Sequence, residues 1–174
     1  MGEHSHAINL WQNFAQSVGV GRVSEVSALA DYVTDGTVDY DKLCVLNLKT
    51  ETGLIGRVVQ DVVTAPTRKW GRIQGSDGFL DWQINIVPGR DNLRWAASES
   101  LSNELVVEKT RPDDFIAELE HIRDVLNDCF DISPISLAHG LDTMLVIAAA
   151  HQSAQSGRTV SIDYQKGYSI DALR

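Results

Sequence analysis

Residues 53–82 read GLIGRVVQDVVTAPTRKWGRIQGSDGFLDW, and this stretch holds the strongest strand and turn signals in the chain. A valine-rich run extends to about Thr64, and two further apolar segments, 68–74 and 79–86, follow it. These two segments flank Gly75-Ser76-Asp77-Gly78, whose Asp-Gly pair suits the positive φ angles of a tight hairpin turn. Apolar and polar residues alternate along 79–86, as they do in a strand. We therefore predict antiparallel strands throughout this stretch.

The rest of the chain places helices on either side of the strands. Helical spacing of apolar residues predicts helices over 6–18 and 136–156, and Thr110-Arg111-Pro112-Asp113 predicts the start of another, with Thr110 as the capping hydroxyl. Further strands are predicted near 26–32, 43–49, 54–64, 92–97, 104–109 and 159–163. The order favours one α+β domain over residues 1–174, with a large, mostly antiparallel open β-sheet and helices packed on one face.

Several expectations concern the core. In the helix over 136–156 we expect Leu137, Leu141, Met144, Leu145 and Ala148 to point inward. Three tryptophans are expected in the core, and three histidines on the surface or as hydrogen-bonded core residues: Trp11, Trp70 and Trp82, then His121, His139 and His151. The strand over 54–64 carries apolar residues on both faces, which one helical layer cannot cover. A second copy or a further domain is therefore expected against the sheet.

Composition and charge exclude several classes of protein. The 174 residues carry a formal net charge of -9, which argues against a nucleic-acid partner. The longest apolar run, 144–150, is too short for a membrane-spanning helix. Residues 1–10 lack the basic and apolar regions of a signal peptide, so we expect a soluble, cytoplasmic protein. Cys44 and Cys129 are expected as free thiols, although a disulfide between them stays open.

Two segments together resemble the C-terminal domain of the Gfo/Idh/MocA oxidoreductases, the family of glucose–fructose oxidoreductase and inositol dehydrogenase. One is the quoted stretch, with its glycine-containing turn, valine-rich strand and Ile-x-Gly-x-x-Gly hairpin. The other, 136–163, reads SLAHGLDTMLVIAAAHQSAQSGRTVSID and is similar to the family's closing helix and strand. The resemblance covers most of residues 1–163. It implies a substrate-binding and oligomerisation domain of an NAD(P)-dependent enzyme that acts on a sugar, cyclitol or related polyol.

The resemblance also implies a set of site residues. The family's Asp-x-Gly-x-His-x-x-Asp-Leu segment aligns with residues 2–10, so that His6 takes the place of the catalytic histidine. Gly2, His4 and Asn9 depart from that motif, at its first aspartate, its glycine and its second aspartate. A histidine suits removal of a hydroxyl proton during hydride transfer because imidazole exchanges protons near neutral pH. His4 and His6 could equally be exposed terminal residues, and two histidines alone make a weak metal site, so no metal is expected.

Relatives place sugar-contacting side chains at the end of the long strand. On this chain that position offers hydroxyl and cationic donors, namely Thr64, Thr67, Arg68 and Lys69. Asp61 is an unusual acid within a valine run, and it could bind substrate or pair with Arg57 or Arg72. Each of these residues could also belong to an ordinary solvated loop.

The cofactor-binding half expected of such an enzyme has no counterpart in the sequence. Gly19-Val20-Gly21 leads from a predicted helix into a predicted strand, the reverse of the dinucleotide-binding order. We therefore expect NAD or NADP to be bound by a separate domain, and neither cofactor nor dehydrogenase activity for this chain alone. The alternative is a stand-alone carbohydrate-binding or dimerisation scaffold that has lost catalysis, or a domain kept only for assembly.

Overall fold

The computed structural model describes residues 4–98, 100–127 and 133–174. These residues form two compact units. The first contains 4–63 and 133–174, and the second contains 64–127. No helix in the described part of the chain is long and apolar enough to cross a membrane. Cys129 lies outside the described residues, whereas Cys44 is buried and forms no disulfide with another described residue.

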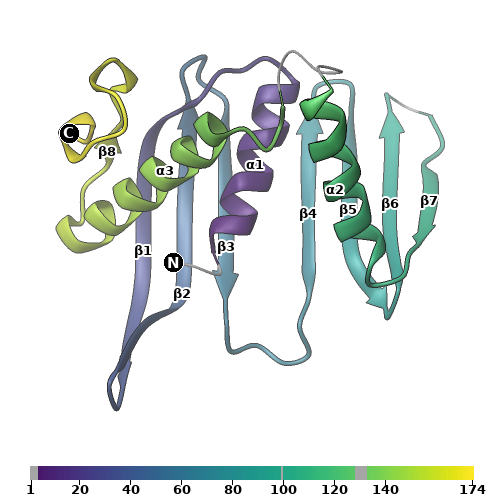
Figure 1. The fold of residues 1–174 in the computed structure, drawn as a ribbon, viewed down its shortest axis with the longest axis horizontal. Coiled ribbons are helices and arrows are strands. Elements are labelled where there is room, and N and C mark those ends of the chain that lie inside the picture. The colour runs from purple at the N-terminus through teal and green to yellow at the C-terminus, as the bar shows by residue number, and fades with distance from the viewer. Residues whose placement is uncertain (1–3, 99, 128–132) are drawn as a thin grey trace. The chain divides into compact units, whose positions relative to one another are not determined.

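The first unit is an antiparallel sheet covered by helices. Its elements are α1 (Ser5–Ser17), β1 (Val23–Asp35), β2 (Val38–Thr50), β3 (Ile55–Asp61), α3 (Leu137–Ser156) and β8 (Val160–Ser161), followed by two short 3₁₀ turns, Tyr164–Lys166 and Ile170–Ala172. The strand order is β3-β2-β1-β8, with every pair antiparallel. Helices α1 and α3 lie across the same face of this sheet (Figure 1).

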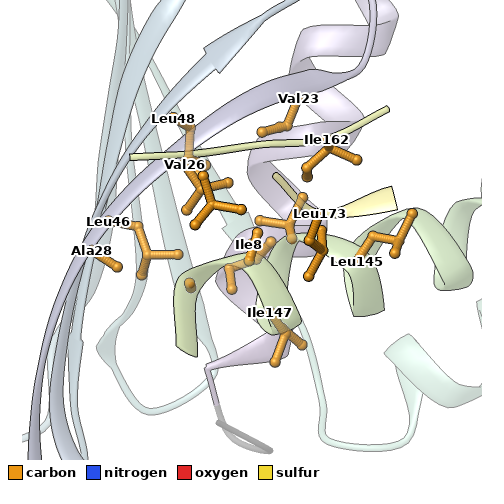
Figure 2. Packing of buried hydrophobic residues seen from close by; sticks show 14 of the residues in the cluster. Ile8, Val23, Val26, Ala28, Leu46, Leu48, Leu145, Ile147, Ile162 and Leu173 are labelled. Atoms are coloured by element: carbon orange, nitrogen blue, oxygen red, sulfur yellow. The ribbon is translucent and has the colours of Figure 1, made fainter. Parts of the chain in front are cut away.

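The core of the first unit lies between that sheet face and the two helices. Val26 of β1, Leu46 of β2 and Ile8 of α1 are fully buried there. Figure 2 shows these side chains converging with those of α3 and of the chain's last residues. Alternate residues in part of each strand point into this layer: Val26 and Ala28 of β1, and Cys44, Leu46 and Leu48 of β2. One face of the sheet is therefore buried under the helices, as the sequence predicts.

The ends of α3 follow the sequence signals, but its inward face follows them only in part. The Ser136 hydroxyl accepts a hydrogen bond from the His139 backbone N–H, and Gly157 adopts a left-handed φ of 68° at the other end. Leu137 and Met144, predicted to point inward, are 79% and 58% exposed. Leu145, also predicted to point inward, is buried, and the rest of the buried face is built from Val146, Ile147, Ala149 and Ala150, together with polar residues described below. The helix is apolar on most sides, so its apolar spacing did not single out one face.

The last residues of the chain extend the sheet at β8. The Ser161 N–H donates to the Arg174 carbonyl, and the Arg174 N–H donates to the Ser161 carbonyl. Ile162 and Leu173 form an antiparallel bridge in the same segment. Residues 172–174 therefore cover the edge that β8 would otherwise expose.

The second unit is a four-stranded meander with one helix. Its elements are β4 (Lys69–Gly75), β5 (Gly78–Val87), β6 (Arg90–Ala97), β7 (Asn103–Glu108) and α2 (Asp113–Leu126), and the strands pair in chain order. The predicted hairpin across 75–78 is confirmed. Gly71 permits close packing, because a Cβ there would lie 2.4 Å from the Trp82 ring.

None of the residues described in the second unit is buried. Trp70, predicted in the core, is 64% exposed, and Phe115 and Leu119 of α2 are exposed to a similar degree. The Thr110 hydroxyl does not cap the helix as predicted; it donates to the Asp113 carboxylate at 2.8 Å. The α+β class with antiparallel strands is confirmed, and the strands are divided between two four-stranded sheets. A single domain over 1–174 stays a prediction.

Candidate functional site

The first turn of α1 presents the predicted catalytic histidine. His6 is exposed. His4, immediately before the helix, is 1% exposed, and its Nε2 lies 3.2 Å from the Asp41 carbonyl oxygen and 3.3 Å from Asp41 Oδ2. The interpretation of His4 as an exposed terminal residue is therefore wrong. His4 ties the start of α1 to β2, while the His6 imidazole is free to meet solvent or a ligand.

Asn9, the third predicted residue of this segment, turns toward α3. Its Nδ2 donates to Thr143 Oγ1 at 3.2 Å. The same hydroxyl donates to Gln12 Oε1 at 2.9 Å. Because Thr143 is buried, these hydrogen bonds are shielded from water and hold α1 against α3. They also fix how α1 is rotated about its own helix axis.

A close contact between Trp11 and Gly56 fixes α1 against β3. A Cβ at Gly56 would lie only 2.2 Å from Trp11 Nε1, so the indole ring rests directly on the glycine backbone. Trp11 also packs against the buried core, as predicted. Together with His4 and Asn9, this contact sets the direction in which α1 presents His6.

A buried polar cluster that the sequence did not indicate lies between α1 and α3. Gln12, His139, Asp142 and Thr143 are between 2% and 6% exposed. Gln12 Nε2, both ring nitrogens of His139 and Asp142 Oδ1 have no hydrogen-bond partner among the residues described. The interpretation of His139 as a surface or hydrogen-bonded core residue is therefore wrong. The His-x-x-Asp spacing on one helical face was the signal that could have indicated this pair.

Burial shapes the electrostatics of this cluster. It raises the pKa of Asp142, and the Arg22 guanidinium, 3.9 Å from Asp142 Oδ1, acts in the opposite direction. Arg22 also stacks on the Tyr164 ring at 3.8 Å and reaches Glu51 at 3.8 Å. The carboxyl therefore holds its proton to a higher pH than an ordinary Asp does.

The remaining predicted residues lie at the end of β3 and just after it. Asp61 belongs to the first unit, and the residues from Thr64 onward belong to the second. Asp61 ends β3 in the first unit and accepts a hydrogen bond from the Val63 N–H at 3.0 Å. Arg57 donates to Asn47 at 2.9 Å, and Arg72 pairs with Asp81 at 3.3 Å. In the second unit, the predicted substrate-contacting side chains are all exposed: Thr64, Thr67, Arg68 and Lys69.

A second polar feature involves α3 and β1. The Tyr32 hydroxyl lies 2.7 Å from His151 Nδ1, and the two rings stack with centroids 5.8 Å apart. Partial burial lowers the pKa of His151. His151 lines a groove of about 900 Å³ in the first unit, together with Gln152, Gln155, Lys166, Asp171 and Arg174. The predicted site residues do not line it.

The described residues contain no group of three or more His, Cys, Asp or Glu side chains that could hold a metal ion.

Comparisons with known proteins identify the fold. No family model matches the chain, and no curated protein matches it. Among solved structures, the aldose-aldose oxidoreductase from Caulobacter crescentus, complexed with glycerol, matches 88% of this chain with a TM-score of 0.68 and 20% identity. Levoglucosan dehydrogenase, in complex with NADH and levoglucosan, matches 86% with a TM-score of 0.68 and 16% identity. An oxidoreductase from Agrobacterium radiobacter, in complex with NAD+, L-tartaric acid and magnesium, matches 86% with a TM-score of 0.62 and 20% identity.

These matches define a fold shared with part of several oxidoreductases. The chain covers 45%, 47% and 46% of those three proteins, respectively, and so spans about half their length. Identities of 16–20% establish the likeness at the level of the fold alone.

Proposed function

We propose that this chain is the C-terminal, substrate-binding and self-associating domain of a Gfo/Idh/MocA-type oxidoreductase that acts on a sugar, cyclitol or related polyol. The observation that carries the proposal is the fold match over 86–88% of the chain to part of three oxidoreductases. All three are complexed with small hydroxylated molecules, and two also hold NAD+ or NADH. The residues and motifs quoted above support the same family.

In this proposal the nicotinamide cofactor, NAD or NADP, binds a further domain. Within the described residues, Gly19 and Gly21 have positive φ angles, but they connect α1 to β1. A dinucleotide-binding turn requires a strand before the glycines and a helix after them, because the helix N-terminus holds the pyrophosphate. When bound, the cofactor would accept or supply the hydride at the substrate's C–OH carbon.

His6 is the proposed general base for the hydroxyl proton. Its exposure on the first turn of α1 leaves the imidazole accessible to a substrate held from outside the unit. His4 and Asn9 are bound to Asp41 and Thr143, so their contribution would be to position α1. Asp61, Thr64, Thr67, Arg68 and Lys69 are proposed to bind the substrate hydroxyl groups.

Calorimetric titration of the 174-residue chain tests the substrate part of this proposal. We expect levoglucosan, glycerol or glucose to bind, and Lys69→Ala to weaken that binding by about tenfold, the loss of one charge-assisted hydrogen bond. Lys166→Ala removes an exposed lysine that lies in the first unit, away from the predicted site residues, and should leave binding unchanged. Equal effects of the two substitutions, or no binding of any polyol, would contradict the proposal.

The same titration with nicotinamide cofactors tests the division of labour. The chain alone should bind neither NADH nor NADPH, and micromolar affinity for either would contradict the assignment of the cofactor to another domain.

A non-catalytic carbohydrate-binding or dimerisation scaffold remains the second candidate. The observation that favours it is the replacement of the motif's glycine and second aspartate by His4 and Asn9, both of which make structural contacts. Polyol binding that is unaffected by His6→Ala, with no turnover when a nucleotide-binding domain and cofactor are supplied, would favour the scaffold.

A further inference from the structure

One side of α3 lines two adjoining hollows in the first unit. The larger is the groove of about 900 Å³ described above, and the smaller has a volume of about 190 Å³. Ala148, Ile170 and Leu173 line both, so the hollows join at these residues. Together they form one continuous depression between α3 and residues 166–174.

The side of α3 that lines this depression changes from apolar to polar along the helix. Leu141, Met144 and Ala148, which the sequence predicts to point inward, line the smaller hollow. Gln152 and Gln155 follow about one and two helical turns after Ala148, on the same side of the helix, and line the larger hollow. The apolar spacing that predicts a core face therefore also marks the apolar end of an amphipathic groove.

The charged residues of the depression all lie at its polar end. Lys166, Asp171 and Arg174 line the larger hollow, and no charged residue among those described lines the smaller one. Arg174 Nη2 lies 2.7 Å from Asp163 Oδ2. Lys166 and Asp171 form no ion pair with another residue in the described part of the chain. Both signs of charge are therefore available to a ligand at this end.

His151 adds an uncharged donor at the polar end. Its Nδ1 lies 2.7 Å from the Tyr32 hydroxyl oxygen. Partial burial lowers the pKa of His151 and raises the pKa of Tyr32, so both side chains are neutral near pH 7. In such a pair the phenol donates to Nδ1, because an imidazole nitrogen accepts a hydrogen bond more readily than a phenol oxygen does. The imidazole proton then lies on Nε2, which is a hydrogen-bond donor.

The wall opposite α3 is held by its own hydrogen bonds. The Ala172 N–H donates to the Ser169 carbonyl and the Leu173 N–H to the Ile170 carbonyl, each at 3.1 Å. The reciprocal bonds of Arg174 with Ser161 join the same wall to the sheet. The depression is therefore formed before a ligand arrives, which reduces the ordering cost of binding.

The charges at the polar end exclude several kinds of ligand. A purely anionic ligand would face Asp171, and a purely cationic ligand would face Lys166 and Arg174. A neutral polyol would remove water from these charges without pairing any of them. A molecule that carries both signs of charge beside an apolar group satisfies both ends of the depression.

We propose that this depression binds a free α-amino acid with a large apolar side chain, such as leucine. Lys166 and Arg174 bind its carboxylate, and Asp171 binds its ammonium group. Its side chain enters the 190 Å³ hollow and covers Met144 and Ile170, which are 58% and 72% exposed. In an α-amino acid all three groups branch from one carbon, which suits a polar end that directly adjoins an apolar one. The inference goes beyond the proposed function and uses none of the residues proposed there for catalysis or substrate binding.

Nuclear magnetic resonance titration of the 174-residue chain with leucine measures both the affinity and the place of binding. The backbone signals of Ala148, Gln152 and Leu173 should shift together, and those of β4–β7 should not. Alanine leaves the smaller hollow empty and should bind on the order of fivefold or more weakly than leucine. Ile170→Ser should weaken the binding of leucine and leave that of alanine unchanged.

Two derivatives of leucine test the charges one at a time. Asp171→Asn should weaken leucine binding by about fivefold, the upper range for one exposed ion pair, but should not weaken the binding of N-acetylleucine, which has no ammonium group. Lys166→Ala should weaken leucine binding by a similar factor but not the binding of leucinamide, which has no carboxylate. Lys49→Ala removes an exposed lysine of β2 outside the depression and should leave all of these affinities unchanged.

Three results would overturn the inference. The first is the absence of any shift at tens of millimolar leucine. The second is leucine binding that is insensitive to both Asp171→Asn and Lys166→Ala, in variants whose circular dichroism confirms folding. The third is displacement of leucine by millimolar glucose, which would show that the depression holds a hydroxylated molecule instead. The first two results leave the proposed function intact, because polyol titration of the Lys69→Ala variant tests it separately.

Discussion

Gly56→Ala is the sharpest test of how α1 is positioned. The added Cβ would lie 2.2 Å from Trp11 Nε1 and 2.5 Å from Cε2 and Cζ2 of the same ring. Favourable contact begins near ~3.5 Å, so the indole must retreat by more than about 1 Å. Trp11 packs against the core, so moving its ring disturbs that packing.

The expected cost follows from two opposing effects. Forcing an extra methyl group into a packed core destabilises a protein by about 1–3 kcal/mol. Replacing glycine by alanine inside a strand returns about 0.5–1 kcal/mol of backbone entropy. We therefore expect Gly56→Ala to lower the free energy of unfolding of the first unit by about 0.5–2 kcal/mol, the difference between the two effects.

Urea unfolding followed by circular dichroism measures this difference. The control is Gly140→Ala on α3, where an added Cβ meets nothing within 4 Å, and which should be stabilising by about 0.5–1 kcal/mol. Trp11→Leu should cost much less in the Gly56→Ala background than in the unsubstituted chain, because the ring that clashes has gone. Equal shifts for the two alanine variants, or strict additivity of Trp11→Leu with Gly56→Ala, would refute the reasoning.

Three further predictions concern titration and helix capping. Burial raises the pKa of Asp142, so the folded chain binds the carboxyl proton more tightly than the unfolded chain does. The free energy of unfolding should therefore fall as pH rises from the ordinary Asp pKa of about 3.9 through the raised pKa of the folded chain. Asp142→Asn should flatten this pH dependence in urea titrations. Burial raises the pKa of Cys44 to about 11, so its reaction with a thiol reagent at pH 8 should be slow until denaturant is added, and fast labelling of the folded chain would contradict its burial. Ser136→Ala removes the cap of α3 and should cost about 1 kcal/mol in the same unfolding assay, whereas Ser156→Ala at the opposite end should cost less.

The sequence predicts the elements well because their signals are local. The Asp-Gly hairpin and the Ser136 and Gly157 ends of α3 depend on a few neighbouring residues. The exposed face of α3 could not be predicted in this way. Its apolar residues occur on most sides, and the choice of Val146 over Met144 for the core depends on where the sheet lies.

In the candidate site too, local sequence patterns predicted some features, whereas contacts between distant segments could not be predicted from them. The exposure of His6 at the start of α1 agrees with its proposed role, but the contacts of His4 with Asp41 and of Asn9 with Thr143 join segments far apart in the chain. No spacing rule connects positions 37 or 134 residues apart. In the polar cluster around Asp142, the spacing of His139 and Asp142 on α3 was a local signal, but the approach of Gln12 from α1 could not be predicted from the sequence.

The order in which the two sheets gather their strands has a consequence for synthesis on the ribosome. The β4–β7 meander is contiguous, so all of its strands emerge together. The other sheet needs β8 and residues 172–174, which follow the meander in the chain. At a translation rate of ~5–20 residues per second, β1–β3 therefore wait on the order of seconds with an unfinished edge after the meander has emerged. Nascent chains stalled before Val160 should expose that edge to chaperones, and those in which Arg174 has emerged from the ribosome should not.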